Sequence, residues 1–521
     1  MKFVSDPAIS IKIQKMKQRV RWQEASIAER GIDQTRFVLD DNQPDNPEFS
    51  FMVIGDSGSG GNRGYHPQRR IAEQMLMHRE DCRFVLHTGD VIYLVGSNEY
   101  YFKNFIEPYR EFLVGGDRPN RIPYDKMTFN LPILPVLGNH DYYDLSLLYS
   151  LIAPAITPLR RLLQFQLNLD IGSRGSNQGK AYAKAFLDYL QDFNASELAQ
   201  HLDQHYTAKT DSGRCLRYEP GQFTRLPNRY YTFRLGGIDF FALDSNTFNS
   251  PLPLPTTPEG DDRRRQLKQR LDELEEQDDK ILATVPQQSD AIDDAEHADD
   301  LKTRITQTQE MKLDVQKQLS TDDTNTIDVE QLEWLQQKLI ESWHTEGVRG
   351  RVLYFHHPPY VTETTKWDQG QTIAIRHRLR QVLDGVAQAV GSKAADRPLV
   401  DLVLNGHAHC LEHLRTVDTG HGDANINWLI CGGSGYSLRR QRIEGPDLLE
   451  GGQDGEGQSR VVARSQLFVG RNGQGSQKRR PYSFLRIDVQ DGRPPRFTIR
   501  PYITERFQGQ WTNKKIEPFI I

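Results

Sequence analysis

The chain has 521 residues, of which 37% are hydrophobic and 26% charged, and its formal net charge is −5. This composition is typical of a folded globular protein, and a chain of this length can bury a large core. The slight acidic excess gives no reason to expect general nucleic-acid binding, which normally shows as a basic excess, so no nucleic-acid partner is expected. No stretch approaches the roughly 18 apolar residues of a membrane span, and no apolar signal segment follows Met1.

The four cysteines, Cys82, Cys215, Cys410 and Cys431, are scattered and form no CxxC pair. We interpret them as reduced thiols, which favours a cytoplasmic location. Cys410 directly follows His409. Both a soft metal ligand and a small buried residue are therefore open interpretations of this thiol.

The N-terminal region predicts a helix and a linker before the main domain. Residues 8–30 form a basic helical pattern with a loose apolar side, which either packs on the main domain or lies on a membrane surface. The acidic, proline-containing stretch at 40–47 indicates a linker. Residues 1–48 are therefore expected to be an N-terminal helical extension and linker.

Five short apolar segments each lead into polar residues. These predicted strands span 49–54, 84–88, 133–137, 351–355 and 402–405, and Pro135 indicates a strand end or a bulge. Because open α/β sheets bind ligands at the C-terminal ends of their strands, the polar residues should meet at one edge. Helices are expected at 68–79 and 328–343, and hairpins at 230–243 and 482–503.

An insertion is predicted between two halves of the main domain, 49–250 and 326–521. Residues 256–323 are dense in charged residues and glutamine, and two thin apolar stripes run along them: Leu267, Leu271, Leu274 and Ile281, then Met311, Val315 and Leu319. The stripes predict a charged helical hairpin over 251–325 that projects into solvent. A partner-binding coiled coil is the alternative.

Three further segments are less specific. The stretch 445–477, rich in Gly, Gln and Arg, is expected to be a mobile loop. The run Gly58–Gly64 either cradles a phosphate through its amides or forms a loop at the rim of a site. Residues 142–228 carry no metal motif and are compatible with a cap beside the site.

The residues that follow the strands are types that bind metal ions. They occur in Gly55–Gly58, Gly89–Tyr93, Gly138–Asp141, His356–Pro359 and Gly406–His409. Two metals about 3.5–4 Å apart need a bridging anion and separate terminal ligands, and Asp90 is the natural bridge. Asp56 adds charge, and a Tyr93 phenolate favours a hard ion such as Fe³⁺.

Neutral donors complete the pattern. Asn139 offers an uncharged oxygen, and His407 and His409 alternate, so that an extended backbone would point both the same way. His140 is expected to face a substrate, where it stabilises a transition state or protonates a leaving oxygen. Asp141 is expected to orient that ring by accepting its proton.

In this order the five segments resemble the motifs of calcineurin-like metallophosphoesterases, and in detail those of the purple acid phosphatase branch: GDxG, GDxxY, GNH(D/E), VxxH and GHxH. Leu353 replaces the usual Val, and Gly58 replaces the His that commoner members carry, a change that Tyr93 accompanies. The resemblance implies an α/β fold, a four-layer α/β/β/α sandwich of two mixed sheets over 49–250 and 326–521, with the helical hairpin inserted.

The resemblance also implies a ligand set. The first metal would be held by Asp56, Asp90, Tyr93 and His409 and the second by Asp90, Asn139, His356 and His407, with iron in one site and zinc, manganese or iron in the other. His357 would either contact the substrate or be a packed neighbour. His140 and Asp141 would be the catalytic pair.

The implied function is metal-dependent hydrolysis of phosphate esters by a metal-bound hydroxide. An acid-phosphatase-like phosphomonoesterase acting on a small molecule or a phosphoprotein is expected, with a phosphodiesterase or a nucleotide phosphohydrolase as alternatives. An alternative of another class is an interaction scaffold that binds a protein partner through residues 256–323.

Overall fold

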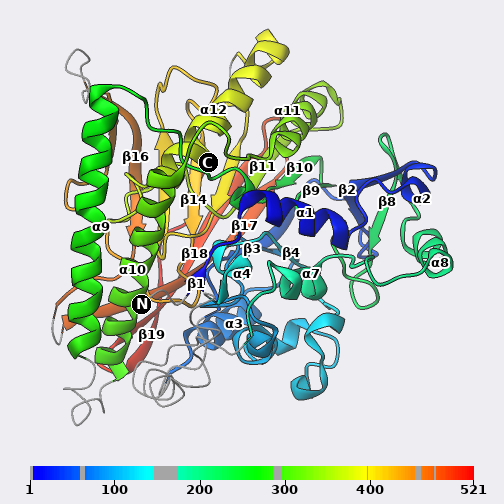
Figure 1. Cartoon of the computed structure of the whole chain (residues 1–521). Helices are drawn as coiled ribbons and strands as arrows, with labels where there is room; N and C mark the ends of the chain where they lie inside the picture. Colours follow the sequence, from blue (N-terminus) through cyan, green and yellow to red (C-terminus); the bar gives the residue numbers. More distant parts are fainter. Residues whose placement is uncertain are drawn as a thin grey trace.

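A computed structural model gives the structure of the chain and describes residues 4–58, 65–145, 174–284, 295–395, 397–451, 459–474 and 477–521. Within these residues, two large mixed sheets form the body of the protein (Figure 1). The 11-stranded sheet has the order β15 (Asp447–Glu450), β16 (Arg460–Val469), β13 (Leu411–Thr416), β14 (Asn427–Cys431), β12 (Leu402–Asn405), β11 (Gly350–Phe355), β10 (Ile238–Ala242), β9 (Tyr231–Leu235), β2 (Ile32–Leu39), β8 (Gly213–Tyr218) and β7 (Ala208–Thr210).

The 7-stranded sheet contains the strands nearest both ends of the main domain. Its order is β19 (Gln510–Lys515), β18 (Arg496–Phe507), β17 (Arg479–Gln490), β3 (Phe49–Ile54), β4 (Cys82–His87) and β5 (Ile133–Pro135), with β20 (Phe519–Ile520) also on β18. β3, β4 and β5 run parallel, and Pro135 ends its strand, as the sequence indicates.

Alternate residues of the central strands belong to two different cores. Val352 and Tyr354 of β11 lie in the core shared with β3, β4 and β17, whereas Leu353 and Phe355 lie in the core shared with α11 (Val329–His344) and α12 (Gly370–Val390). Successive residues of a strand point to opposite faces. Burial on both faces therefore explains why these strands are continuous apolar runs.

Helices cover the outer faces of both sheets. α11 and α12 pack on the larger sheet, and α3 (Pro67–Met77) packs on β17 and β18 of the smaller one (Figure 1). The predicted four-layer sandwich of two mixed sheets is confirmed.

The N-terminal region packs on this body. α1 (Ile9–Arg19) buries Met16, and α2 (Ala25–Ala28) follows, so the helix expected over 8–30 ends at Arg19. β2 then enters the larger sheet between β8 and β9, which the sequence did not reveal. A short pair, β1 (Val4–Ser5) with β6 (Asp144–Leu145), also ties the N-terminus to the domain.

The inserted segment forms two long helices, α9 (Pro258–Thr284) and α10 (Ala295–Ser320). Their predicted stripes meet in a small cluster of Leu267, Leu271 and Leu274 with Met311, Val315 and Leu319. The expectation that the hairpin projects into solvent is wrong for α10, which lies between α9 and the sheets (Figure 1) and buries a second, polar face against the domain.

The segment 445–477 differs from the sequence expectation because it contributes β15 and β16 to the larger sheet. Its residues 452–458 and 475–476 lie outside the described residues, as do 59–64 of the glycine run. Within 142–228, the described residues include α7 (Lys180–Phe186) and α8 (Ala195–His205), and 146–173 lie outside.

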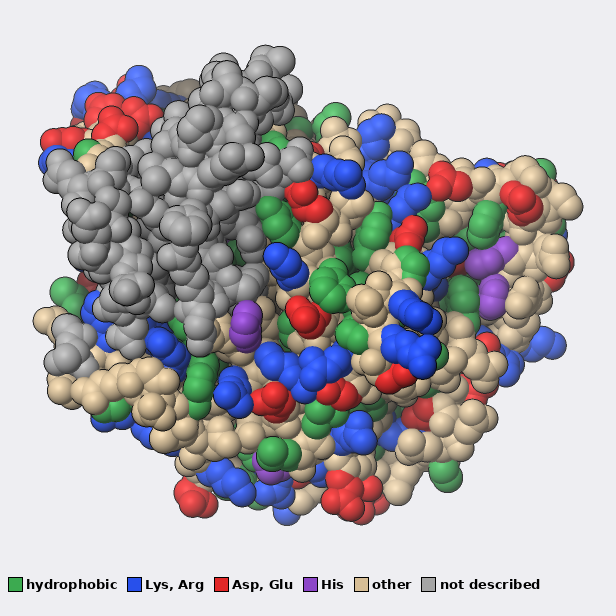
Figure 2. All heavy atoms as spheres, turned by 90° about the horizontal axis from the view of Figure 1, so that it is seen from below, with side chains coloured by type: hydrophobic (Ala, Val, Ile, Leu, Met, Phe, Trp, Pro, Cys, Tyr) green, Lys and Arg blue, Asp and Glu red, His purple; other side chains and the backbone are tan. Residues whose placement is uncertain are grey.

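The described surface is mixed in charge. Figure 2 shows Lys and Arg side chains interspersed with Asp and Glu over the described part of one face. Among the helices of the described ranges, none combines the length and the apolar character needed to cross a membrane.

Candidate metal centre

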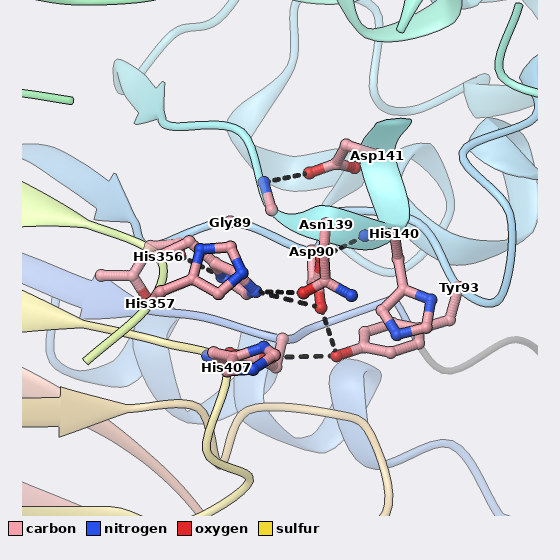
Figure 3. Close-up of polar contacts among 12 residues, drawn as sticks. Gly89, Asp90, Tyr93, Asn139, His140, Asp141, His356, His357 and His407 are labelled. Atoms are coloured by element: carbon pink, nitrogen blue, oxygen red, sulfur yellow. Dashed lines mark hydrogen bonds and ion pairs between the residues drawn. The ribbon is translucent and has the colours of Figure 1, made fainter. Parts of the chain in front are cut away.

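The predicted ligands lie at the C-terminal ends of five core strands. Asp56 follows β3, Asp90 follows β4 and Asn139, in α4 (Asn139–Tyr142), follows β5, while His356 and His407 follow β11 and β12. Because the strands within each sheet are parallel neighbours, these ends meet at one edge. Figure 3 shows the side chains of Asp90, Asn139, His356 and Tyr93 converging there.

Three of these residues have a strained backbone. Asp56 has φ 52°, Asp90 φ 54° and His407 φ 64°, all in the left-handed region, and each follows a glycine. A non-glycine residue in this region costs about 1–3 kcal/mol and persists where the surroundings enforce it. The turn after each strand is therefore held in a shape that aims a donor side chain across the edge.

The four residues predicted for the first metal are brought together by Tyr93. Its hydroxyl lies 2.9 Å from Asp56 Oδ1, 2.6 Å from Asp90 Oδ2 and 3.0 Å from His409 Nε2. All four side chains are buried, with at most 1% of each exposed. Two carboxylate oxygens and one imidazole nitrogen therefore surround the phenol oxygen of Tyr93.

A second cluster surrounds His356. Its Nε2 lies 2.9 Å from Asn139 Oδ1 and 3.3 Å from Asp90 Oδ2, so Asp90 contacts both clusters. Asp56, Asp90 and His356 form one group whose ligand atoms are close enough for a metal ion. His356, His357 and His407 form another.

Backbone carbonyls fix the orientation of two imidazoles. Nδ1 of His356 lies 2.8 Å from the Thr88 carbonyl, and Nδ1 of His409 lies 2.9 Å from the Ser437 carbonyl. When Nδ1–H donates to a carbonyl, Nε2 carries the lone pair that a metal needs. Both Nε2 atoms point into the cluster, which is the arrangement expected of ligands.

Burial and mutual charge shift the pKa values of the clustered side chains. Burial, reinforced by the neighbouring Asp90, raises the pKa of Asp56 well above its usual range. Burial has the same direction for Asp90, but His356 and His140 outweigh it and hold the pKa of Asp90 below its usual range. Burial lowers the pKa of His409 to about 3, so this imidazole is neutral. Burial opposes the shift of His356, but Asp90 and Asp56 outweigh it and raise the pKa of this imidazole to about 9. Carboxylate and imidazole are donor types that fit zinc, iron or manganese, and binding a metal would displace the protons that these groups hold.

His407 and His357 have hydrogen-bond partners outside the ligand set. Nε2 of His407 accepts from Lys366 Nζ at 3.1 Å and from Gln371 Nε2 at 3.0 Å. Nδ1 of His357 lies 2.8 Å from Ser245 Oγ. The two rings are 4.5 Å apart between centroids, so both face the second cluster.

The expected pairing of His140 with Asp141 is wrong. Nδ1 of His140 lies 2.6 Å from the Leu94 carbonyl, which orients the ring. The Asp141 carboxylate instead accepts from the backbone N–H of Gly138, at 2.9 Å, and of two residues of the β4 loop, Val91 and Ile92. Asp141 therefore holds two ligand-bearing turns together, whereas the Nε2 of His140 faces the site.

Glycines permit this close approach of the turns. A Cβ on Gly138 would stand 2.0 Å from Asp90 Oδ1 and 2.2 Å from Asp90 N.

Cys410 is a buried member of the core under α11 and α12, which agrees with its interpretation as a small packed residue.

Sequence reasoning missed three charged residues beside the site. Lys366 and Arg439 come from loops, and Glu310 comes from α10. Glu310 Oε2 lies 2.8 Å from Lys366 Nζ, and its Oε1 lies 3.8 Å from Arg439 Nη2. The sequence contains one signal that could have indicated Glu310. A polar stripe recurs at helical spacing along this segment: Thr303, Thr306, Glu310, Asp314 and Lys317.

The carboxylate, phenol and imidazole donors at one strand edge of a two-sheet sandwich are the arrangement that a dinuclear metal site needs. Residues 49–284 match the sequence model of the family described as calcineurin-like phosphoesterase. This match spans a little under half of the chain, so these residues are similar to a calcineurin-like phosphoesterase domain.

Comparison with solved structures finds distant similarity. A purple acid phosphatase, PPD1 from yellow lupin seeds, is 10% identical with a TM-score of 0.40 over 92% of this chain and 54% of its own. PhoD is 13% identical, with a TM-score of 0.38 over 91% of this chain and 69% of its own. GAP50, titled the anchor in the inner membrane complex of Plasmodium, is 11% identical, with a TM-score of 0.36 over 90% and 89%.

This chain thus spans about half of the lupin enzyme, and likeness this distant carries no functional argument. Comparison with curated protein sequences finds no significant match.

Proposed function

We propose that the protein is a phosphomonoesterase of the purple acid phosphatase type. The observation that carries the proposal is the Tyr93 hydroxyl, which lies within 3.0 Å of Asp56, Asp90 and His409 donor atoms. A phenolate in that position provides a hard donor suited to Fe³⁺. Phosphodiester and nucleotide hydrolysis remain the alternative activities.

The proposed ligand set follows the two clusters. One ion takes Asp56, Asp90, Tyr93 and His409, and the other takes Asp90, Asn139, His356 and His407. Iron in the first site, with zinc, manganese or iron in the second, is the proposed content. When bound, the two ions supply Lewis acidity and an activated water for attack on phosphorus.

The protein itself supplies orientation and a proton. His140 keeps Nδ1–H on the Leu94 carbonyl, so its Nε2 carries a second proton only in the imidazolium form. We assign His140 Nε2–H as the proton donor to the leaving oxygen, which converts imidazolium to neutral imidazole. His357 lies beside the second cluster and is proposed to contact the substrate.

The test combines metal content with turnover of an aryl phosphate. Wild-type protein is expected to hold two ions including iron, with a broad visible charge-transfer band from the Tyr93 phenolate. Asp90→Ala, which removes the carboxylate common to both clusters, is expected to lose metal and abolish turnover.

His140→Ala is the matched control, because it keeps the ligand set. It should retain both metals while kcat falls by about 10²–10⁴-fold. Turnover of wild-type size in Asp90→Ala would refute the assignment. Two metals without the visible band would remove Tyr93 from the ligand set.

We further propose a cytoplasmic location, which the four free, buried cysteines support. The substrate is proposed to be a phosphorylated small molecule or a phosphoprotein. Protein binding through residues 256–323 stays a prediction.

A further inference from the structure

Helix α10 covers the metal centre with a polar face. Glu310 is 9% exposed and His140 only 3%, so the site is closed from this side. The Glu310 carboxylate is directed at the same buried space as His140, Lys366 and Arg439.

Glu310 satisfies only one of the three cationic or donor groups around it. Its Oε2 accepts from Lys366 Nζ at 2.8 Å, but its Oε1 stands 3.9 Å from His140 Nε2 and 3.8 Å from Arg439 Nη2. Among the described residues, these two nitrogens are buried and have no hydrogen-bond partner. Arg439 Nη2 is a donor, and His140 Nε2 is one in the imidazolium form; buried donors normally have an acceptor.

A phosphoryl group fits this arrangement better than a carboxylate does. It offers three terminal oxygens, where a carboxylate offers two, and it carries more negative charge. Lysine and arginine are the side chains that proteins use to hold phosphate oxygens. Lys366 Nζ also lies 3.1 Å from His407 Nε2, which places this ammonium at the edge of the metal cluster.

We propose that the Glu310 carboxylate stands in the place of a substrate phosphoryl group, that Lys366 and Arg439 are phosphoryl-binding residues, and that α10 is an autoinhibitory lid. The inference rests on the proposed function, since it places the phosphoryl group beside the metals. Substrate binding then requires Glu310, and the α10 segment that carries it, to leave.

The lid is held by contacts that water can replace. Arg439 Nη1 donates to the Thr303 carbonyl at 2.9 Å, and Thr306 Oγ1 lies 3.1 Å from Tyr436 Oη. Asp314 accepts from the backbone N–H groups of Gly370 and Gln371 at the start of α12, at 3.0 and 3.2 Å.

The apolar stripe of Met311, Val315 and Leu319 on α10 packs in one cluster with leucines of α9. Polar interfaces between parts of one chain resemble transient protein–protein interfaces, so relative motion across them is expected. The two helices can therefore move away together without exposing their shared apolar cluster.

The first experiment titrates metal-loaded protein with inorganic phosphate by calorimetry. Glu310→Gln keeps the shape but removes the competing charge, so phosphate should bind about tenfold more tightly than to wild type. The matched control is Glu276→Gln, the same change at an exposed position of α9, which should leave phosphate affinity unchanged. Unchanged or weaker phosphate binding in Glu310→Gln overturns the proposal.

A second variant loosens the lid without changing the site. Asp314→Asn weakens the contact with α12 and should also tighten phosphate binding, by less than Glu310→Gln does. Hydrogen–deuterium exchange should then show faster exchange in residues 303–317 of wild-type protein at saturating phosphate. Slower or equal exchange under phosphate would show that α10 does not leave, and would reject the lid.

These measurements are separable from the proposed function. Phosphate affinity and hydrogen–deuterium exchange can be measured without turnover. A protein that fails to hydrolyse aryl phosphates can therefore still be tested for tighter phosphate binding in Glu310→Gln. If Glu310→Gln instead loses turnover while phosphate affinity is unchanged, Glu310 belongs to the catalytic machinery and the lid is rejected.

Discussion

The metal centre and the α10 face that covers it are both buried and polar, yet they are built in opposite ways. The proposed donors of the candidate metal centre stand in loops that follow core strands, and backbone carbonyls orient His356 and His409. The face of α10 is instead held by side-chain hydrogen bonds. The candidate metal centre is therefore preorganised, whereas the α10 face can move away from it.

The largest effect is expected from adding one methyl group where two ligand-bearing turns touch. Gly138→Ala would place a Cβ 2.0 Å from Asp90 Oδ1. Because neither turn can yield, metal affinity should fall about 100-fold and the free energy of unfolding by about 1–3 kcal/mol. Metal titration and urea denaturation measure the two effects.

Gly347→Ala is the control, since a Cβ there meets nothing within 4 Å. It should leave metal affinity unchanged. Normal metal binding in Gly138→Ala would mean that the turns adapt, and the contrast with α10 would disappear.

Glu310 of α10 and Glu412 of the larger sheet are buried differently, which gives a pH test. Glu310 has Lys366 beside it, whereas Glu412 of β13 accepts from the Thr362 hydroxyl and from Thr362 N at 3.1 Å. Burial raises the pKa of Glu412 from 4.5 to about 7. Between these pH values the folded protein holds a proton that the unfolded chain has lost, so stability falls as pH rises.

The loss reaches about 3 kcal/mol by pH 7 and is absent below pH 4.5. Glu412→Gln should remove this part of the pH dependence in urea denaturation, while Glu275→Gln, an exposed change on α9, should not. An identical pH slope in wild type and Glu412→Gln would contradict the assignment.

The smallest expected effect is local. Leu274 of α9 is 1% exposed in the thin cluster between α9 and α10. Leu274→Ala should lower the opening free energy of the hairpin by about 2 kcal/mol, seen as faster amide exchange in α9 and α10, without changing global unfolding. Leu353→Ala, in the core under α11 and α12, should lower global stability by about 2–5 kcal/mol. A global loss from Leu274→Ala would make the hairpin an integral part of the domain.

The same contrast explains what could be read from the sequence. The strands and the residues that follow them were predictable because apolar runs and adjacent ligands are local patterns, as in Phe49–Ile54 followed by Asp56. Glu310 was not, because a charged residue on a charged helix looks solvated until the helix is placed. The role expected of Asp141 failed for a related reason: its partners are backbone amides, which no side-chain pattern reveals.

Strands β15 and β16 were missed because they lie in a stretch whose composition indicates a loop, and β2 was missed because it lies in the region expected to be a helical extension and linker. Their pairing partners, β8 and β13, are distant in sequence, and pairing over such distances is decided by packing rather than propensity.

The position of β3 has a consequence for synthesis of the chain. This strand, at residues 49–54, lies between β4 and β17, and β17 ends at Gln490. At about 5–20 residues per second, the ribosome takes tens of seconds to deliver β17 after β3 has emerged. The smaller sheet therefore stays incomplete, with β3 lacking one of its two neighbouring strands, until almost the whole chain has been made.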